Sequence, residues 1–374
     1  MAKPKVTVWL GTRKGSYGLT SDASRKKWSV RGPYHVGNDV FHVVADPREP
    51  RSVYALVNSG WFGPRVFRSK DGGTKWNEVA PPMMALGKDR QHDETGAAER
   101  GPIVNLWHLT PGPENEPGSW FLGIDPAALF RSDDRGASWT GMDGLNQHRT
   151  RPKWNPGAGG MCLHSIVLDP TRPKRMYAGI SAAGVFRSDD GGEHWTPKNV
   201  GVQVGFQPEK NPEVGQCVHK IVLDPADPTT VYRQDHDGIH VSHDSADTWK
   251  RVGKVLDHDF GFVVTAPKAL PGEAFFAPLE PMSRLGAGGQ LQVYRWSERT
   301  RKFTPTVKGR PFPGDLGTHR DALDSDGLDP AGLYLGTTTG QLFVSPDGAK
   351  SWLEVPYRFP AIHSVSVAPA PAGV

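Results

Sequence analysis

SDDGGEHW, the eight residues from Ser188 to Trp195, decides the fold because the chain repeats its pattern. The pattern Ser-x-Asp-x-Gly-x-x-Trp also reads SKDGGTKW from Ser69 to Trp76 and SDDRGASW from Ser132 to Trp139. Short Asp and Ser side chains bond nearby backbone N–H groups, and Gly supplies a positive φ, so each copy predicts a hairpin turn. The Trp then packs across the neighbouring strands. Weaker copies are SHDSADTW (Ser242–Trp249), SPDGAKSW (Ser345–Trp352), SDASRKKW (Ser21–Trp28) and the eroded YRWSERTRKF (Tyr294–Phe303).

A longer frame surrounds the pattern and predicts four antiparallel strands. CLHSIVLDPTRPKRMYAGISAAGVFRSDD, from Cys162 to Asp190, aligns with CVHKIVLDPADPTTVYRQDHDGIHVSHD, from Cys217 to Asp244. Each copy contains an apolar strand, an Asp-Pro turn, a second strand, a Gly turn and a third strand that leads into the eight-residue pattern. A short fourth strand follows the Trp. Four strands per repeat are typical of a β-propeller blade.

The two ends of the chain share one blade. VTVWLGT near the N-terminus aligns with a second strand, and the missing first strand, AIHSVSVAPAP (Ala361–Pro371), stands near the C-terminus. The sequence therefore predicts an all-β fold: one seven-bladed propeller domain over residues 1–374, in which the C-terminal inner strand pairs with the N-terminal strands and removes a free sheet edge. The predicted blades are 5–30 with 360–371, then 38–78, 103–141, 161–197, 216–251, 259–305 (poorly marked) and 318–354.

The eight-residue pattern resembles the BNR/Asp-box repeat family, which belongs with WD40/YVTN/BNR-like and sialidase-related propellers. The resemblance covers nearly the whole chain and implies a propeller. Members of the family include sialidases and other glycoside hydrolases, but their boxes lie on the blade periphery, away from the active site. The resemblance therefore implies the fold and carries little about function.

The composition excludes several classes of protein. Two cysteines in 374 residues do not form a disulfide scaffold and predict a reducing, cytoplasmic setting. No apolar stretch approaches the roughly 20 residues of a membrane span, and no secretory signal is visible at the start. Acidic and basic residues are interspersed at a net charge of +4, which predicts neither a nucleic-acid nor a membrane partner. The oligomeric state is left open.

Histidines recur at one position of the first strands. Counting back thirteen residues from the aromatic of each second strand, or six from the proline that follows the first, gives the ring His363, Phe41, His108, His164, His219, Gly261 and Asp321. Innermost strands line a propeller's channel, and neutral imidazoles with a carboxylate hold divalent metals. The sequence therefore predicts a transition metal (Zn, Fe, Cu, Mn or Ni) at the channel mouth. The predicted ligands are His108, His164, His219, His363 and Asp321.

Residues next to this ring are expected to support it. The predicted catalytic residues are Asp321, as ligand or base, with Arg320 and His319. Long connections on one face, among them 77–103, 140–161, 196–216, 278–289 and 304–318, predict a loop-roofed pocket for a small molecule or glycan. The predicted supporting and pocket residues are Cys162, Cys217, Asp39, Asp259, His258 and Phe41.

These residues suggest three hypotheses for the function. The leading hypothesis is a metal-dependent enzyme, most simply a hydrolase, with an oxygenase or lyase as variants. The second is a metal-free, sialidase-like glycoside hydrolase, since YRFP (Tyr357–Pro360) resembles an arginine-bearing sialidase motif. The third is a non-catalytic binding or assembly scaffold. Blade duplication offers a plainer origin for the histidines, in which each ring bonds a neighbouring backbone group.

Overall fold

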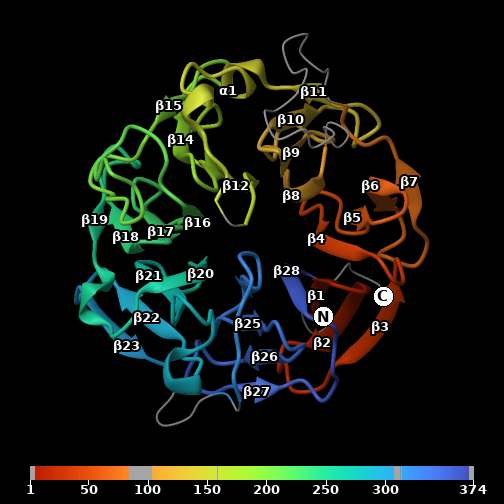
Figure 1. Cartoon of the computed structure of the whole chain (residues 1–374). Helices are drawn as coiled ribbons and strands as arrows, with labels where there is room; N and C mark the ends of the chain where they lie inside the picture. The colour runs from red at the N-terminus through yellow and green to blue at the C-terminus, as the bar shows by residue number, and fades with distance from the viewer. Residues whose placement is uncertain (1–4, 84–102, 158, 307–311, 313, 370–374) are drawn as a thin grey trace.

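Seven four-stranded antiparallel sheets form a closed ring in the computed structural model, which describes residues 5–83, 103–157, 159–306, 312 and 314–369 (Figure 1). The predicted all-β, seven-bladed propeller is confirmed. Residues 370–371 of the predicted first blade, and residues 84–102 of the longest predicted connection, lie outside the described residues.

Each blade is one meander of four strands. In order around the ring, the strands are β28 (Ile362–Pro369), β1 (Lys5–Thr12), β2 (Gly15–Asp22) and β3 (Ser29–Tyr34); β4 (Asp39–Ala45), β5 (Val53–Ser59), β6 (Gly63–Ser69) and β7 (Asn77–Val79); β8 (Asn105–Pro111), β9 (Trp120–Asp125), β10 (Leu129–Ser132) and β11 (Thr140–Gly141); β12 (Leu163–Leu168), β13 (Met176–Ile180), β14 (Gly184–Ser188) and β15 (Thr196–Pro197); β16 (Val218–Leu223), β17 (Val231–Asp235), β18 (Gly238–Ser242) and β19 (Lys250–Arg251); β20 (Phe260–Thr265), β21 (Glu273–Leu279), β22 (Tyr294–Ser297) and β23 (Lys302–Pro305); β24 (Leu323–Ser325), β25 (Leu333–Gly336), β26 (Leu342–Ser345) and β27 (Leu353–Glu354).

In the part of the chain that the structure describes, helices are few and lie in the connections. They are α1 (Asp143–Asn146) and the 3-10 turns η1 (Arg151–Lys153), η2 (Gly253–Val255) and η3 (Ala287–Gly289). Among the described residues, no helix has the length and apolar character needed to cross a bilayer.

The ring closes as the sequence predicts. β28 pairs antiparallel with β1, from Val6 opposite Pro369 to Thr12 opposite Ile362. Figure 1 places the blue C-terminal strand beside the red N-terminal strands. β1 thereby gains a partner on each side, and the first blade has four strands like the others.

The eight-residue repeat forms the turn that its composition predicts. Ser188 Oγ accepts the Gly192 N–H at 2.8 Å and donates to Asp190 Oδ1, while Asp190 Oδ1 accepts the His194 N–H at 3.0 Å. Gly192 has a φ of 96°. The buried Trp195 donates its indole N–H to the Gly192 carbonyl. The motif thus satisfies its own polar groups at the rim of the blade.

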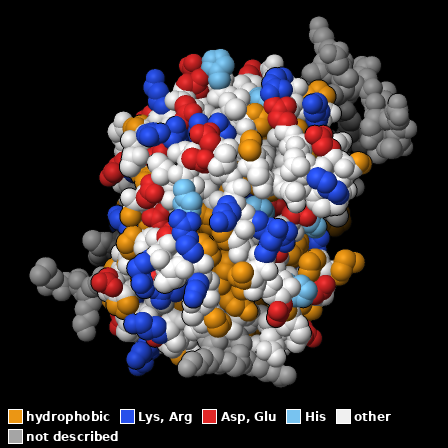
Figure 2. Space-filling model, turned by 90° about the vertical axis from the view of Figure 1, so that its left-hand side faces the viewer, with side chains coloured by type: hydrophobic (Ala, Val, Ile, Leu, Met, Phe, Trp, Pro, Cys, Tyr) orange, Lys and Arg blue, Asp and Glu red, His pale blue; other side chains and the backbone are white. Residues whose placement is uncertain are grey.

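Apolar packing between neighbouring blades holds the ring together. Tyr177 and Val185 of the fourth blade pack with Ile221 and Val231 of the fifth, and all four are buried. A fully buried side chain of this size contributes about 1.5–3 kcal/mol relative to its exposed state. On the side of the molecule in Figure 2, basic and acidic side chains are both present and neither sign fills the face.

Candidate functional site

A bulge in the inner strand sets the side chains that face the channel. The pairing of inner strand with second strand slips by one residue at Phe41 in β4, at Trp107 in β8, at His164 in β12 and at His219 in β16. The same slip lies at His363 in β28. In β20 it takes in Phe262 and Val263. An extra residue in one strand re-aims its side chain, so these residues are the true equivalents around the ring.

The bulge corrects the predicted ring at two places. In the third blade the equivalent residue is Trp107, and His108 is its neighbour; in the sixth it is Phe262 rather than Gly261. In the third blade the count from the second strand fails because Phe121 pairs with Thr110, so the connection is one residue longer than in the fourth blade, where Tyr177 pairs with Val167. In the sixth blade the count from Pro267 fails because this proline comes one residue earlier relative to the strand pairing. Contacts between side-chain rings support the new assignment. The ring centroid of Phe41 lies 4.9 Å from that of Trp107 and 5.0 Å from that of His363. The ring centroid of His219 lies 4.6 Å from that of Phe262.

A cavity of about 420 Å³, which we call the inner pocket, opens beside this ring. Its walls come from the inner strands and from the predicted connections 140–161, 196–216, 278–289 and 304–318. Its lining residues are Gly157, Gly159, Gly160, Ser181, Ala182, Phe206, Cys217, His219, His236, Phe262, Arg284, Thr318, His319, Arg320 and Thr338. No Asp or Glu is among these described residues.

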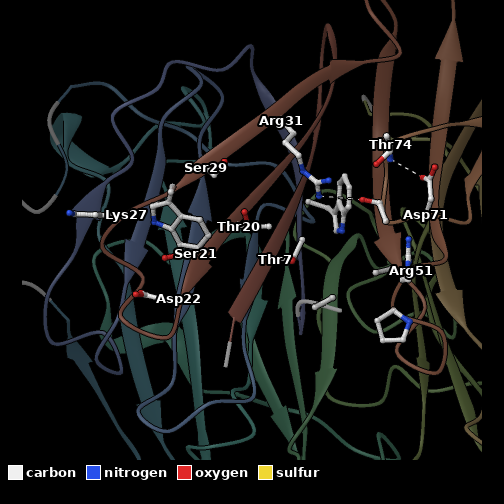
Figure 3. Close-up of a pocket in the computed structure, with 16 residues that line it drawn as sticks. Thr7, Thr20, Ser21, Asp22, Lys27, Ser29, Arg31, Arg51, Asp71 and Thr74 are labelled. Carbon is white, nitrogen blue, oxygen red and sulfur yellow. Dashed lines mark hydrogen bonds between the residues drawn. The ribbon is translucent and has the colours of Figure 1, made fainter. Parts of the chain in front are cut away.

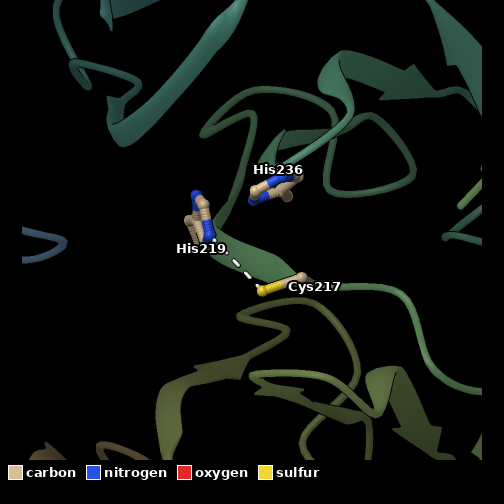
Figure 4. A group of neighbouring side chains, drawn as sticks. All are labelled: Cys217, His219 and His236. Carbon is tan, nitrogen blue, oxygen red and sulfur yellow. Dashed lines mark hydrogen bonds between the residues drawn. The ribbon is translucent and has the colours of Figure 1, made fainter. Parts of the chain in front are cut away.

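Three potential metal ligands meet in the inner pocket (Figure 4). One ligand atom each from Cys217, His219 and His236 lies within 4.8 Å of the other two. Cys217 and His219 flank the start of β16, and His236 lies in the turn after β17. The His236 N–H donates to the Cys217 carbonyl at 2.9 Å, which fixes the turn against the strand.

The tautomer of His219 follows from its hydrogen bonds. Its Nδ1 lies 2.6 Å from the Gly261 carbonyl, which only accepts, so Nδ1 carries the proton. Burial, reinforced by Arg320, holds the pKa of His219 well below its ordinary value, so the ring is neutral. Its Nε2 lone pair therefore faces the Cys217 sulfur at 3.5 Å. Burial raises the pKa of the Cys217 thiol to about 11, so without a cation it donates its proton to this nitrogen.

Asp321 belongs to a buried network instead. Its carboxylate forms an ion pair with Lys220 and accepts a hydrogen bond from His108 Nδ1 at 3.3 Å. The ring of His108 stacks on His42 with centroids 4.4 Å apart. Burial alone would raise the pKa of Asp321, but Lys220 and His108 hold it well below its ordinary value. We call Lys220, Asp321, His108 and His42 the buried network; none of them lines the inner pocket.

The predicted ligands therefore occupy separate surroundings. His164 is fully buried, with Nε2 2.8 Å from the Val218 carbonyl and Nδ1 3.0 Å from Ser165 Oγ, so both of its nitrogens are satisfied. Among the described residues, no three of the predicted ligands His108, His164, His219, His363 and Asp321 bring their ligand atoms together. His164 and His219 instead each bond the carbonyl of the next blade, which is the plainer arrangement expected from blade duplication.

His363 and His319 form a pair of their own. Their ring centroids lie 4.9 Å apart, and His363 Nε2 lies 3.0 Å from Asp39 Oδ1. His319 Nδ1 lies 2.9 Å from the Ile362 carbonyl, so Nδ1 carries the proton. Burial, with a contribution from His363, lowers the pKa of His319 to about 4, which leaves a neutral ring in the wall of the inner pocket.

Most of the other predicted pocket residues do not line the inner pocket. Cys162 is buried and its thiol lies 3.3 Å from Ser181 Oγ. Asp259 pairs with Arg251 at 2.6 Å, outside the lining. His258 is half-buried in the loop before β20 and does not line the pocket. Of the predicted supporting residues, only Cys217 lines it.

Two arginines dominate the charge of the inner pocket. The Arg320 guanidinium lies 5.6 Å from the Trp107 ring centroid and 5.4 Å from that of Phe262. Arg284 lies 5.5 Å from the Phe262 centroid. Sequence reasoning placed Arg320 but missed Arg284 and His236, because both come from turns that carry no repeated signal.

A second, larger cavity of about 650 Å³ lies between the first two blades, and we call it the outer pocket (Figure 3). Arg31 reaches from β3 toward the turn of the second blade that carries Asp71 and Thr74. Its guanidinium lies 5.8 Å from the Trp9 ring centroid and donates to the Gly72 carbonyl at 3.2 Å. None of the predicted site residues lines this pocket.

Two curated proteins are similar to the chain in sequence. An oligoxyloglucan-reducing end-specific xyloglucanase of Emericella nidulans is 24% identical over 354 residues, which are 85% of this chain and 40% of that protein. A xyloglucanase of a Paenibacillus species is 24% identical over 201 residues, which are 50% of this chain and 17% of that protein. The chain thus spans less than half the length of either relative. No family model matches the chain.

Solved structures share its fold. An ancestral GH74 enzyme superimposes with a TM-score of 0.59 at 16% identity, over 96% of this chain and 40% of that one. YCF48 from Cyanidioschyzon merolae superimposes with a TM-score of 0.56 at 12% identity, over 91% of this chain and 98% of that one. At these identities the likeness establishes the β-propeller architecture that this chain has in common with both.

Proposed function

We propose that this chain is a metal-dependent hydrolase whose ion is held by Cys217, His219 and His236 in the inner pocket. The observation that carries the proposal is the fixed tautomer of His219. Its protonated Nδ1 is held by the Gly261 carbonyl, and its free Nε2 lies 3.5 Å from Cys217 Sγ. Ordinary zinc–sulfur and zinc–nitrogen lengths in a tetrahedral site separate two such ligand atoms by about 3.6 Å.

The chemistry of the ligand set supports a catalytic ion. Metal-bound histidines ordinarily donate their second N–H to a carbonyl or carboxylate, as His219 does to Gly261. One thiolate and two imidazoles suit zinc, and also copper or iron. Three protein ligands leave a fourth position for water, whose pKa a bound metal lowers toward neutrality. A reducing compartment such as the predicted cytoplasm keeps the thiol available.

His319 supplies a base in the same pocket. Its Nδ1 proton is committed to the Ile362 carbonyl, and its pKa of about 4 leaves Nε2 unprotonated, as a weak base, at neutral pH. The predicted base Asp321 is a weaker candidate because Lys220 and His108 already occupy its oxygens.

The curated relatives support hydrolysis and a glycan substrate. Both are named xyloglucanases. Because this chain spans 40% and 17% of their lengths, the substrate is part of the proposal. The lining of the inner pocket contains no Asp or Glu among the described residues. Glycosidases that use a carboxylate pair need two such groups beside the bond, so a metal centre is the simpler source of catalysis here.

The test is elemental analysis of untagged protein, followed by zinc titration of the metal-free form. We expect about one equivalent of a transition metal in the native chain, and a loss of affinity of at least tenfold in Cys217→Ser and His236→Ala. The controls are Cys162→Ser and His164→Gln, which change the counterparts of Cys217 and His219 in the preceding blade and should keep the metal. If the native chain neither contains nor takes up zinc, copper, iron, manganese or nickel, the proposal fails.

A glycoside hydrolase without metal is the second candidate, and Asp125 is the observation that favours it. Burial raises the pKa of Asp125, as suits a general acid. A Cβ placed on Gly160, in the pocket wall, would lie 3.0 Å from its Oδ2. Arg358, the arginine of the sialidase-like motif, is exposed and paired with Glu354. This candidate would be favoured if Asp125→Asn lost glycan hydrolysis and if the native chain hydrolysed glycan equally well with and without metal. A chain with neither metal nor hydrolysis would be better explained as a scaffold.

A further inference from the structure

The inner pocket is lined by positive side chains, and Asp125, behind Gly160, interacts with Arg320 from beyond ion-pair distance. Two arginines and three histidines line it, and no Asp or Glu does among the described residues. No ion pair within 4.0 Å in the described part of the chain involves Arg284 or Arg320. By contrast, the neighbouring Arg233 and Arg251 pair with Asp235 and Asp259. Arg320 is half-buried, whereas Arg284 is exposed. A half-buried guanidinium without an ion pair is stabilised when an anion binds beside it.

Arg320 is held in place by neighbouring side chains, and its Nε–H has no hydrogen-bond partner among the described residues. Its guanidinium lies against Trp107 of the third blade and Phe262 of the sixth, so rings from opposite sides of the channel fix its plane. Its Nη2 donates to Ser181 Oγ at 3.1 Å. Its Nε is buried without a hydrogen-bond partner in the structure. Thr318 Oγ1, in the same wall, is also buried without a partner.

Arg284 adds a second guanidinium at the same ring. It lies 5.5 Å from the Phe260 centroid and 5.5 Å from the Phe262 centroid. It comes from the 278–289 connection, whereas Arg320 comes from the start of the seventh blade. Both guanidiniums lie near Phe262 and, among the described residues, neither forms an ion pair with a carboxylate, so together they attract an anionic group to the pocket.

We propose that the inner pocket binds the carboxylate of a sugar acid, with Arg320 as the principal partner and Arg284 as the second. This inference rests on the proposed function, for which it names the class of substrate. A planar carboxylate matches the fork of a guanidinium. Phe206, Phe262 and Ala182 give the rest of the wall apolar surface. This surface suits the carbon faces of a sugar ring, whereas a free inorganic anion would leave it without a contact.

The experiment is calorimetric titration of the full chain with glucuronate and galacturonate, against glucose and galactose. We expect at least one uronate to bind about tenfold or more tightly than its neutral sugar, since hydrogen bonds to charged groups are worth that much. Arg320→Gln should remove this preference, Arg284→Gln should reduce it, and Arg320→Lys should restore part of it. Arg31→Gln, in the outer pocket, is the matched control and should bind like the native chain.

Three results would overturn the proposal: equal affinity for acid and neutral sugar, an unchanged preference in folded Arg320→Gln, or tighter binding of glucose 6-phosphate than of either uronate. Circular dichroism and thermal melting check that each variant is folded, and Arg320→Lys serves if Arg320→Gln is not. Repeating the titration in Cys217→Ser/His236→Ala separates the two proposals. If the double variant still binds uronate, the carboxylate site is supported even when no metal is found. If the native chain binds a metal but shows no preference for uronate, the metal proposal stands and the carboxylate proposal is refuted.

Discussion

The buried network and the inner pocket draw on the same two segments, β16 and the residues just before β24, yet their charges are arranged in opposite ways. Lys220 follows His219, and Asp321 follows Arg320, so two consecutive pairs each contribute one residue to each region. In the network, Lys220 and His108 compensate Asp321. In the inner pocket, no Asp or Glu is among the described lining residues beside Arg320 and Arg284. The bulge at His219 re-aims its side chain relative to that of Lys220, so one strand supplies both stability and a place for a ligand.

The largest effect should come from uncoupling the buried network. Lys220→Met leaves the Asp321 carboxylate buried without its cation, and removing one partner of a buried ion pair costs about 3–5 kcal/mol. Urea denaturation of Lys220→Met should show this loss in the free energy of unfolding. The double variant Lys220→Met/Asp321→Asn should regain most of it. Equal stability of the native chain and Lys220→Met would mean that the network is not compensated in the way described.

A smaller effect on the free energy of unfolding should come from the protonation of His42 as the pH falls. Burial, with a contribution from His108, lowers the pKa of His42 to about 3, against about 6.5 in an unfolded chain. Between these values the unfolded state binds a proton that the folded state does not, so this contribution to stability is complete above pH 6.5 and is lost as the pH falls. His42→Asn keeps an acceptor for the Leu109 N–H without titrating. Denaturation at pH 7 and pH 5 should show the native chain losing about 2 kcal/mol more than the variant.

The prediction for His42 would be wrong if the native chain and His42→Asn lost the same free energy of unfolding between pH 7 and pH 5. That result would indicate a charged or solvated His42, and the contrast between a compensated network and an open pocket would weaken.

The smallest effect should come from the edge of the inner pocket. Ser181→Ala removes the acceptor of Arg320 Nη2 and of the Cys162 thiol. We expect the free energy of unfolding to fall by about 1 kcal/mol, the ordinary worth of such hydrogen bonds. Uronate affinity should fall about threefold as the guanidinium loses its alignment. Thermal melting and calorimetry measure the two. A loss of stability as large as that of Lys220→Met would place Ser181 and Arg320 in the structural network instead of the pocket.

The sequence determined the ring and much of its lining. The Ser-Asp-Gly-Trp turns satisfy their own hydrogen bonds within eight residues, so the pattern is legible without the fold. The displaced first strand at residues 361–371 likewise predicted closure. His164, His219 and His363 were placed at equivalent positions, and the structure puts all three at the bulge.

Tertiary structure alone decided which of these residues meet. A one-residue bulge exchanges the side chain that faces the channel, so His108 passed to the buried network and Trp107 took its place. His236 and Arg284 come from turns whose approach to β16 and β20 depends on how whole blades pack, a relation between distant segments that no local pattern encodes. Local hydrogen bonding fixes turns and strands from the sequence, whereas the meeting of ligands and charges across the ring depends on long-range packing and register.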